Sequence, residues 1–170
     1  MIIRATKQLL QLSRIPPVKF AEEVPSPFPG EWYASQVNRF DGRYKAIHFL
    51  HNPTRVSILV PGTKLKSSIT SLESRTNALL IRNGYGRLLF KYQMASPPEF
   101  YTTNNRSIIA SMNQMRYGIE HHLSMPELKE EINLDEIEDI QLGYLFSTQK
   151  KGLDFSSAKR ILDEILLKEK

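Results

Sequence analysis

Three strand-like runs within residues 31–62 constrain the fold more than any other feature of this chain. Each run is rich in the aromatic and β-branched residues that favour strands. The runs cover residues 32–40, 44–51 and 55–60. Asp41-Gly42 suits a tight hairpin turn between the first two, because glycine tolerates a positive φ, and Pro53-Thr54 separates the last two. The pattern predicts a three-stranded antiparallel meander.

The second hairpin predicts its own strand register. If its loop has two residues, Phe49 faces Ile58 and Ile47 faces Val60. One face of the meander is then apolar, and it consists of Ile47, Phe49, Val56, Ile58 and Val60. The opposite face is more polar and shows Tyr44, His48, Arg55 and Ser57 beside Leu50 and Leu59. An apolar sheet face needs helices against it.

Amphipathic helices are predicted after the meander in the sequence. Apolar residues recur at helical spacing near residues 68–82, 105–123 and 156–168. Asn83-Gly84 is a natural end for the first helix, and Asn104 or Asn105 caps the second. The predicted fold class is therefore α+β, with an antiparallel sheet near residues 31–60 packed on one face by these helices.

The length of 170 residues suits one domain with an appendage. We expect an α+β domain over residues 1–123, with an acidic segment and a C-terminal helix, residues 124–170, packed on it. Short strands are expected at residues 1–6 and 99–103. The proline-rich residues 16–30 predict an extended connector.

Charge is distributed unevenly along the chain, whose net charge is +5. Residues 1–119 contain 16 Lys and Arg against 6 Asp and Glu, whereas residues 120–139 contain one Lys and 8 acidic residues. A basic body suits an anionic partner, either nucleic acid or an acidic protein. The acidic segment, prominent in residues 127–139, either competes with that partner or forms an ordinary solvated face.

Several kinds of chemistry are excluded or unsupported. The chain has no Cys, which excludes disulfides, thiol catalysis and thiolate metal sites. Its histidines, His48, His51, His121 and His122, are not at chelating spacings, and no nucleophile or phosphate-loop motif is present. We expect no metal and no cofactor. No long apolar run or signal-peptide pattern occurs, so we expect a cytoplasmic protein without membrane contact.

Four motifs resemble the signature of an uncharacterised bacterial family known only as a domain of unknown function. They are Thr6-Lys7-x-Leu9-Leu10, Trp32-x-Ala34, Arg43-x-Lys45, and the stretch from Asn105 to Asn113. The resemblance covers about residues 1–120, and the chain departs from it at Ala110, where the family tends to have Gly, and at Gln114, where it tends to have Asp. It implies a bacterial or phage-borne cytosolic α+β domain and no particular activity.

The candidate site residues are Arg43, Lys45, Arg106, Asn113 and His48. Arg43 and Lys45 alternate onto one face of a strand, and Arg106 lies two helical turns from Asn113. If these groups converge, they form a cationic pocket for phosphate or carboxylate. The alternative is that Arg106 and Asn113 only tie loops down by hydrogen bonds.

Three functions remain open at this point. The first is a non-enzymatic binding domain that recognises nucleic acid or an acidic protein through its basic body. The second is a nuclease-like toxin that uses Arg106, Asn113, His48 and Lys45. The third is a protein-interaction module of a toxin–antitoxin or phage-defence system. The sharpest hypothesis is that Arg43, Lys45 and Arg106 border one anion-accepting surface.

Overall fold

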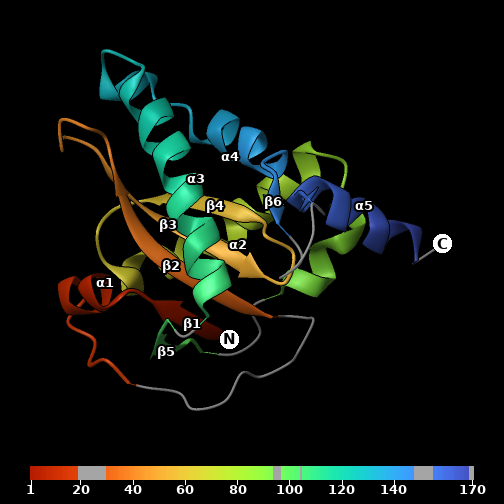
Figure 1. Cartoon of the computed structure of the whole chain (residues 1–170), viewed down its shortest axis with the longest axis horizontal. Helices are drawn as coiled ribbons and strands as arrows, with labels where there is room; N and C mark the ends of the chain where they lie inside the picture. The colour runs from red at the N-terminus through yellow and green to blue at the C-terminus, as the bar shows by residue number, and fades with distance from the viewer. Residues whose placement is uncertain (19–29, 94–96, 104, 148–154, 169–170) are drawn as a thin grey trace.

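A five-stranded mixed sheet forms the centre of the computed structural model, which describes residues 1–18, 30–93, 97–103, 105–147 and 155–168 (Figure 1). The strands are β1 (Ile2–Ala5), β2 (Glu31–Asn38), β3 (Lys45–Asn52), β4 (Ser57–Pro61) and β5 (Glu99–Thr102), in the order β4-β3-β2-β1-β5. A two-stranded ribbon pairs β6 (Phe146–Ser147) with β7 (Phe155–Ser156). Most of the predicted connector, residues 19–29, lies outside the described residues.

The predicted meander is confirmed, together with its register. Strand β3 is antiparallel to both β2 and β4. Phe49 pairs with Ile58 and Ile47 pairs with Val60, and all four side chains are buried. The alternation of apolar and polar residues therefore predicts which side chains of these strands share a face.

The prediction of a purely antiparallel sheet is wrong at β1. This strand runs parallel to β2 on one side and to β5 on the other. A short helix, α1 (Lys7–Leu12), follows β1, and Thr6 caps it by accepting the Leu9 N–H at 3.3 Å. Because a helical crossover rather than a tight turn leads from β1 to β2, the two strands can run in the same direction.

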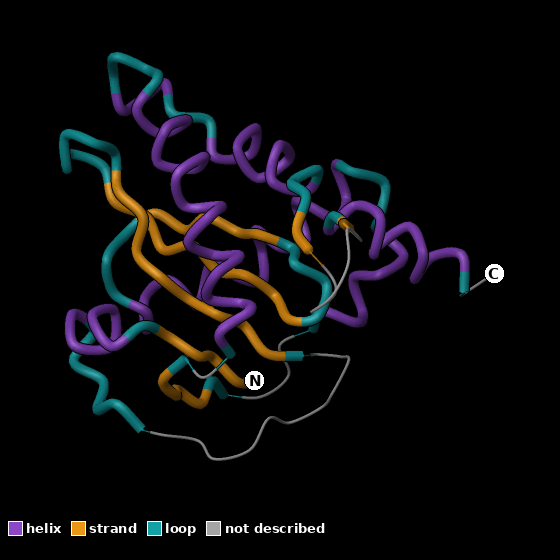
Figure 2. Tube along the Cα trace, in the orientation of Figure 1, coloured by secondary structure: helices purple, strands orange, loops and turns teal. Residues whose placement is uncertain are grey.

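Helices cover both faces of the sheet, which corrects the prediction of a single covered face (Figure 2). The larger elements are α2 (Leu65–Arg82), η1 (Gly86–Tyr92), α3 (Arg106–Ser124), α4 (Leu134–Leu142) and α5 (Ala158–Leu167), and a short turn, η2 (Lys129–Glu131), precedes α4. The first face packs against α1, α2, η1 and α5, whereas the second packs against α3 and α4.

The second face is buried although its sequence looks partly polar. Tyr33, Leu50 and Leu59 pack there against Met112 and Ile119 of α3. Two polar side chains of this face form short contacts within the protein, Arg4 with Glu31 and His48 with Ser57, which offsets part of the free energy that their burial costs. The resulting core is a second hydrophobic layer, which the residue pattern of the meander alone did not indicate.

A carboxylate of the acidic segment holds α4, which is part of that segment, against β4 at the edge of the sheet. Glu138 is fully buried, and its Oε1 accepts the backbone N–H of Leu59 on the edge strand β4 at 2.8 Å. Arg75 and Arg82 of α2 donate to the same carboxylate, at 2.9 Å each. Burial raises the pKa of Glu138, while the two arginines and the Leu59 N–H act in the opposite direction. Part of the acidic segment is therefore structural.

Candidate functional site

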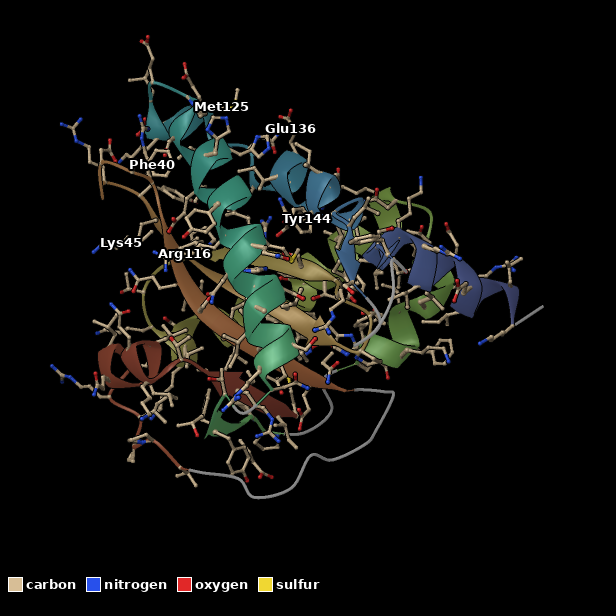
Figure 3. All side chains as sticks on the ribbon, in the orientation of Figure 1. Phe40, Lys45, Arg116, Met125, Glu136 and Tyr144 are labelled. Carbon is tan, nitrogen blue, oxygen red and sulfur yellow. The ribbon has the colours of Figure 1, made fainter. Side chains whose placement is uncertain are left out.

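The structure places two of the predicted site residues at the β2–β3 hairpin. The Arg43 side chain is 84% exposed, and its Nε lies 3.8 Å from Asp41 Oδ2. Lys45 is the first residue of β3 and points outward (Figure 3). Both cations are accessible to an anionic partner.

Arg106 lies away from this hairpin. It is the first residue of α3, which rises about 27 Å from Arg106 to Ser124 at 1.5 Å per residue. The hairpin contacts the other end of α3, where the Phe40 N–H donates to Ser124 Oγ at 2.9 Å. The structure therefore does not bring Arg106 together with Arg43.

Asn113 and His48 differ sharply in exposure. Asn113 lies on the outer side of α3, in a shallow depression of about 380 Å³ that Arg116, Tyr117 and Glu120 also line. His48 is fully buried on the sheet face under α3 and α4, and its Nε2 lies 2.7 Å from Ser57 Oγ. Burial lowers the pKa of His48 to about 3, so its ring is neutral at pH 7. These residues do not converge into a nuclease-like site.

Segments that meet near the start of β3 carry further exposed cations besides Lys45. Ser13 Oγ, at the end of α1, accepts the Leu65 N–H at 2.9 Å, so Arg14 lies beside the start of α2. The Gly62 N–H donates to Lys45 O at 3.0 Å, which brings β3 to the same place. The exposed cations of these segments, called the basic surface below, are Lys7, Arg14, Lys45, Lys64 and Lys66.

Within the described ranges, no acidic side chain pairs with the basic surface. Its five cations form no ion pair with any residue in the described ranges. The segments that carry them, residues 1–18 and 42–72, contain no Asp or Glu. The positive amino end of α2 lies between Lys64 and Lys66 and adds to the same potential. Sequence reasoning found only Lys45 of this group, because three distant segments contribute to it.

A buried polar cluster on the second sheet face was also missed. Arg4 is fully buried and donates two hydrogen bonds of 2.8 Å to the Glu31 carboxylate. The Tyr33 hydroxyl donates to Glu31 Oε2 at 3.5 Å. Arg55 lies over the Phe146 ring at 5.4 Å, and burial lowers the pKa of its guanidinium. The cluster ties β1 to β2, and no local motif indicates a contact between residues 27 positions apart.

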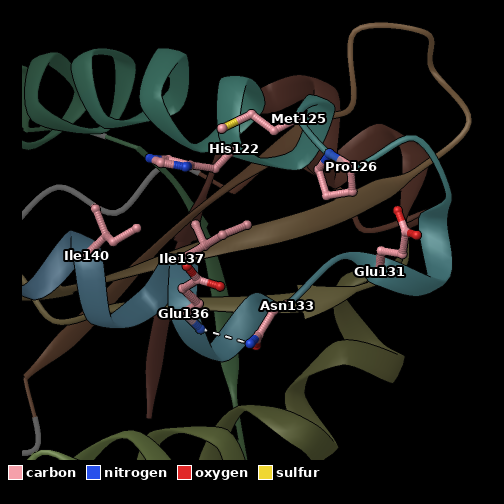
Figure 4. Close-up of a pocket in the computed structure, with 8 residues that line it drawn as sticks. All are labelled: His122, Met125, Pro126, Glu131, Asn133, Glu136, Ile137 and Ile140. Carbon is pink, nitrogen blue, oxygen red and sulfur yellow. Dashed lines mark hydrogen bonds between the residues drawn. The ribbon is translucent and has the colours of Figure 1, made fainter.

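A pocket of about 280 Å³ lies between the end of α3 and α4 (Figure 4). Its volume falls just below the range of about 300–1,000 Å³ that is typical of small-molecule sites. Its lining residues are His122, Met125, Pro126, Glu131, Asn133, Glu136, Ile137 and Ile140. Asn133 Oδ1 accepts the Glu136 N–H at 3.3 Å and caps α4 at the pocket mouth.

The described residues include no group of three or more His, Cys, Asp or Glu side chains placed to hold a metal ion. His48 and His51 lie on opposite faces of β3, as their spacing predicts, because His48 Nε2 contacts Ser57 while His51 Nδ1 lies 2.7 Å from Thr54 Oγ1 and its ring contacts Trp32. Within the described chain, no helix combines the length and the apolar character needed to cross a membrane.

The fold and surfaces define a mixed α/β domain with helices on both faces of one sheet. Residues 2–159 match the family model described as Domain of unknown function (DUF6933), and the chain belongs to this family. The expected membership of a domain-of-unknown-function family is thereby confirmed, and the match extends past residue 120 through α4. Comparisons with curated proteins and with solved structures found no match.

Proposed function

We propose that this protein is a cytoplasmic, non-enzymatic domain that binds nucleic acid through its basic surface. The observation that carries the proposal is the set of five exposed cations, drawn from three segments, with no acidic partner among the described residues. Lys and Arg side chains neutralise phosphates and release counterions from the nucleic acid. The basic surface thus offers affinity for a phosphate backbone.

The arrangement favours a phosphodiester chain over a single small anion. The cations are spread along α1, the start of β3 and the start of α2 rather than concentrated around one cavity. Phosphate contacts of this kind position a nucleic acid without reading its sequence. We therefore expect weak preference among sequences. An acidic protein is the competing partner, and it would place its carboxylates on the same cations.

The test is a fluorescence anisotropy titration with labelled single-stranded DNA, double-stranded DNA and single-stranded RNA. The substituted protein carries Lys45→Ala, Lys64→Ala and Lys66→Ala. A matched control carries Arg87→Ala, Lys159→Ala and Lys168→Ala, which remove three exposed cations from η1 and α5 and leave the same net charge. Arg106→Ala tests separately whether the other end of α3 contributes.

We expect the basic-surface variant to bind at least about tenfold more weakly than the control variant. The logarithm of the association constant should fall with the logarithm of salt concentration, by about 0.9 for each phosphate contacted on duplex DNA. Equal binding by the two triple variants would contradict the proposal. Binding to an acidic polypeptide such as polyglutamate, but to none of the three nucleic acids, would assign the surface to an acidic protein instead.

A further inference from the structure

The acidic residues between positions 120 and 139 form two groups in the structure. The first group pairs with arginine side chains and consists of Glu120, Asp135, Glu138 and Asp139. The carboxylates of the second group form no ion pair with an arginine among the described residues, and the group consists of Glu127, Glu130, Glu131 and Glu136. Every member of the second group is exposed. The fold therefore uses half of this negative charge and leaves the other half at the surface.

Two acidic residues of the second group lie beside exposed apolar side chains, and one of them, Glu131, also accepts the Leu128 N–H at 3.3 Å. Glu131 and Glu136 line the pocket between α3 and α4, and apolar atoms of Met125 and Ile140 face the same space (Figure 4). Met125 is 64% exposed and Ile140 is 45% exposed. Exposed apolar groups that adjoin one another and have a charged rim are typical of protein interaction sites.

The exposed apolar area continues past the pocket. Leu128 is 59% exposed in the loop after α3, and Phe40 is 69% exposed at the tip of the β2–β3 hairpin. A hydrogen bond from the Phe40 N–H to Ser124 Oγ holds that tip beside the end of α3, and Figure 3 shows Phe40 and Met125 at the same end of the molecule. Two further exposed apolar side chains therefore lie at the same end of the molecule as the pocket.

We propose that this pocket docks a basic amphipathic segment of a partner protein. An aliphatic side chain of the partner enters between Met125 and Ile140, while its Lys or Arg side chains pair with Glu131 and Glu136. Charge complementarity selects this occupant, because Glu131 and Glu136 make the rim acidic, which attracts Lys and Arg side chains and repels phosphates. This site is distinct from the basic surface and goes beyond the proposed nucleic-acid binding.

The pocket volume fits the same occupant. At about 280 Å³ it accepts one or two side chains rather than a whole cofactor. An amphipathic helix offers such side chains at i, i+3 and i+4 and places cations on the flanks of the apolar stripe. Because hot spots of interfaces lie in recessed pockets, Ile140 and Glu136 should carry a large share of the affinity.

The test uses a labelled synthetic peptide of about 14 residues, composed of Leu and Lys with Leu at helical spacing. Two control peptides accompany it: one with the same composition in a non-amphipathic order, and one with Glu in place of Lys. Full-length protein is titrated as wild type, Ile140→Asn and Glu136→Lys. Matched controls are Ile81→Asn on α2 and Glu164→Lys on α5, which change another exposed isoleucine and another exposed glutamate away from the pocket.

We expect the amphipathic cationic peptide to bind best, and Ile140→Asn and Glu136→Lys each to weaken it at least about tenfold. Both control variants should stay within about twofold of wild type, and circular dichroism should show that all four variants are folded. Equal affinity for the scrambled peptide, or unchanged binding by the pocket variants, would overturn the proposal. A dimer detected by light scattering that Ile140→Asn dissociates would assign the pocket to a second copy instead.

Discussion

At the scale of single residues, His48 shows how burial keeps an imidazole neutral and out of contact with solvent. Its Nε2 contacts Ser57 Oγ at 2.7 Å, and its Nδ1 is buried with no hydrogen-bond partner among the described residues. A charged imidazole there would lose its hydration without gaining a counterion. This cost explains the lowered pKa and makes His48 a candidate for the pH dependence of folding.

We predict that the protein loses stability as the pH falls below 6.5. The unfolded chain takes up a proton at His48 near its ordinary pKa of 6.5, whereas the folded protein does not until about pH 3. His48 should therefore contribute its full stabilisation above pH 6.5 and lose about 2 kcal/mol of it between pH 7 and 5. Urea unfolding at several pH values measures this loss.

The variant His48→Gln isolates that contribution, because glutamine keeps a polar group near Ser57 but does not titrate. The variant should lose less free energy of unfolding than wild type between pH 7 and 5, whatever its stability at pH 7. If the two proteins lose the same amount, another group is responsible and this account of His48 is wrong.

At the scale of elements, the cap of α3 is a feature that residue types alone predict well. Asn105 Oδ1 accepts the backbone N–H groups of Ser107 and Ile108, at 3.0 and 3.2 Å. Asn105→Ala should lower the free energy of unfolding by about 1 kcal/mol, since alanine cannot accept these bonds. Asn113→Ala, at an exposed position within the same helix, is the matched control and should change stability by less than about 0.5 kcal/mol. Equal effects in thermal or urea unfolding would contradict the capping role.

Glu138 is the fully buried member of the carboxylates that attach α4, beside Asp135 and Asp139, which also pair with arginines of α2. Glu138→Ala would leave the Leu59 N–H without its acceptor and would remove the shared partner of Arg75 and Arg82. We expect a loss of about 3 kcal/mol, as for other buried charge pairs that lose one member. Faster hydrogen exchange at the Leu59 amide would locate the effect at the sheet edge. Glu136 lies two residues before Glu138 and is exposed, so Glu136→Ala should leave the exchange rate of the Leu59 amide unchanged.

At the scale of the whole molecule, local sequence patterns predicted the contacts between segments that are adjacent in the sequence. The register of β3 with β4 followed from alternation within one hairpin. The parallel pairing of β1 with β5 joins residues 97 positions apart, and a four-residue strand carries too little information to select that partner. The second covered face was missed because side chains such as His48 and Arg55 appear polar in sequence.

The same reasoning explains how much of the candidate site could be predicted. The excess of positive charge in residues 1–119 was visible in the sequence, and Lys45, one of the predicted site residues, is exposed. The neighbours of Lys45 depended on how α1 and α2 pack together, through the contact of Ser13 with Leu65. Arg106, in contrast, was grouped with Arg43 because both are cations at positions of the family-like motifs, and the length of α3 separates them.

The position of β1 between β2 and β5 also determines the order in which the sheet can be completed during protein synthesis. Residues 31–61 can pair among themselves as soon as they are made, because all three strands of the meander are consecutive. One side of β1 stays unpaired until residues 99–102 emerge from the ribosome. An open strand edge is prone to pair with other chains. The nascent chain therefore carries an exposed edge through much of its translation, and the arrival of β5 closes it.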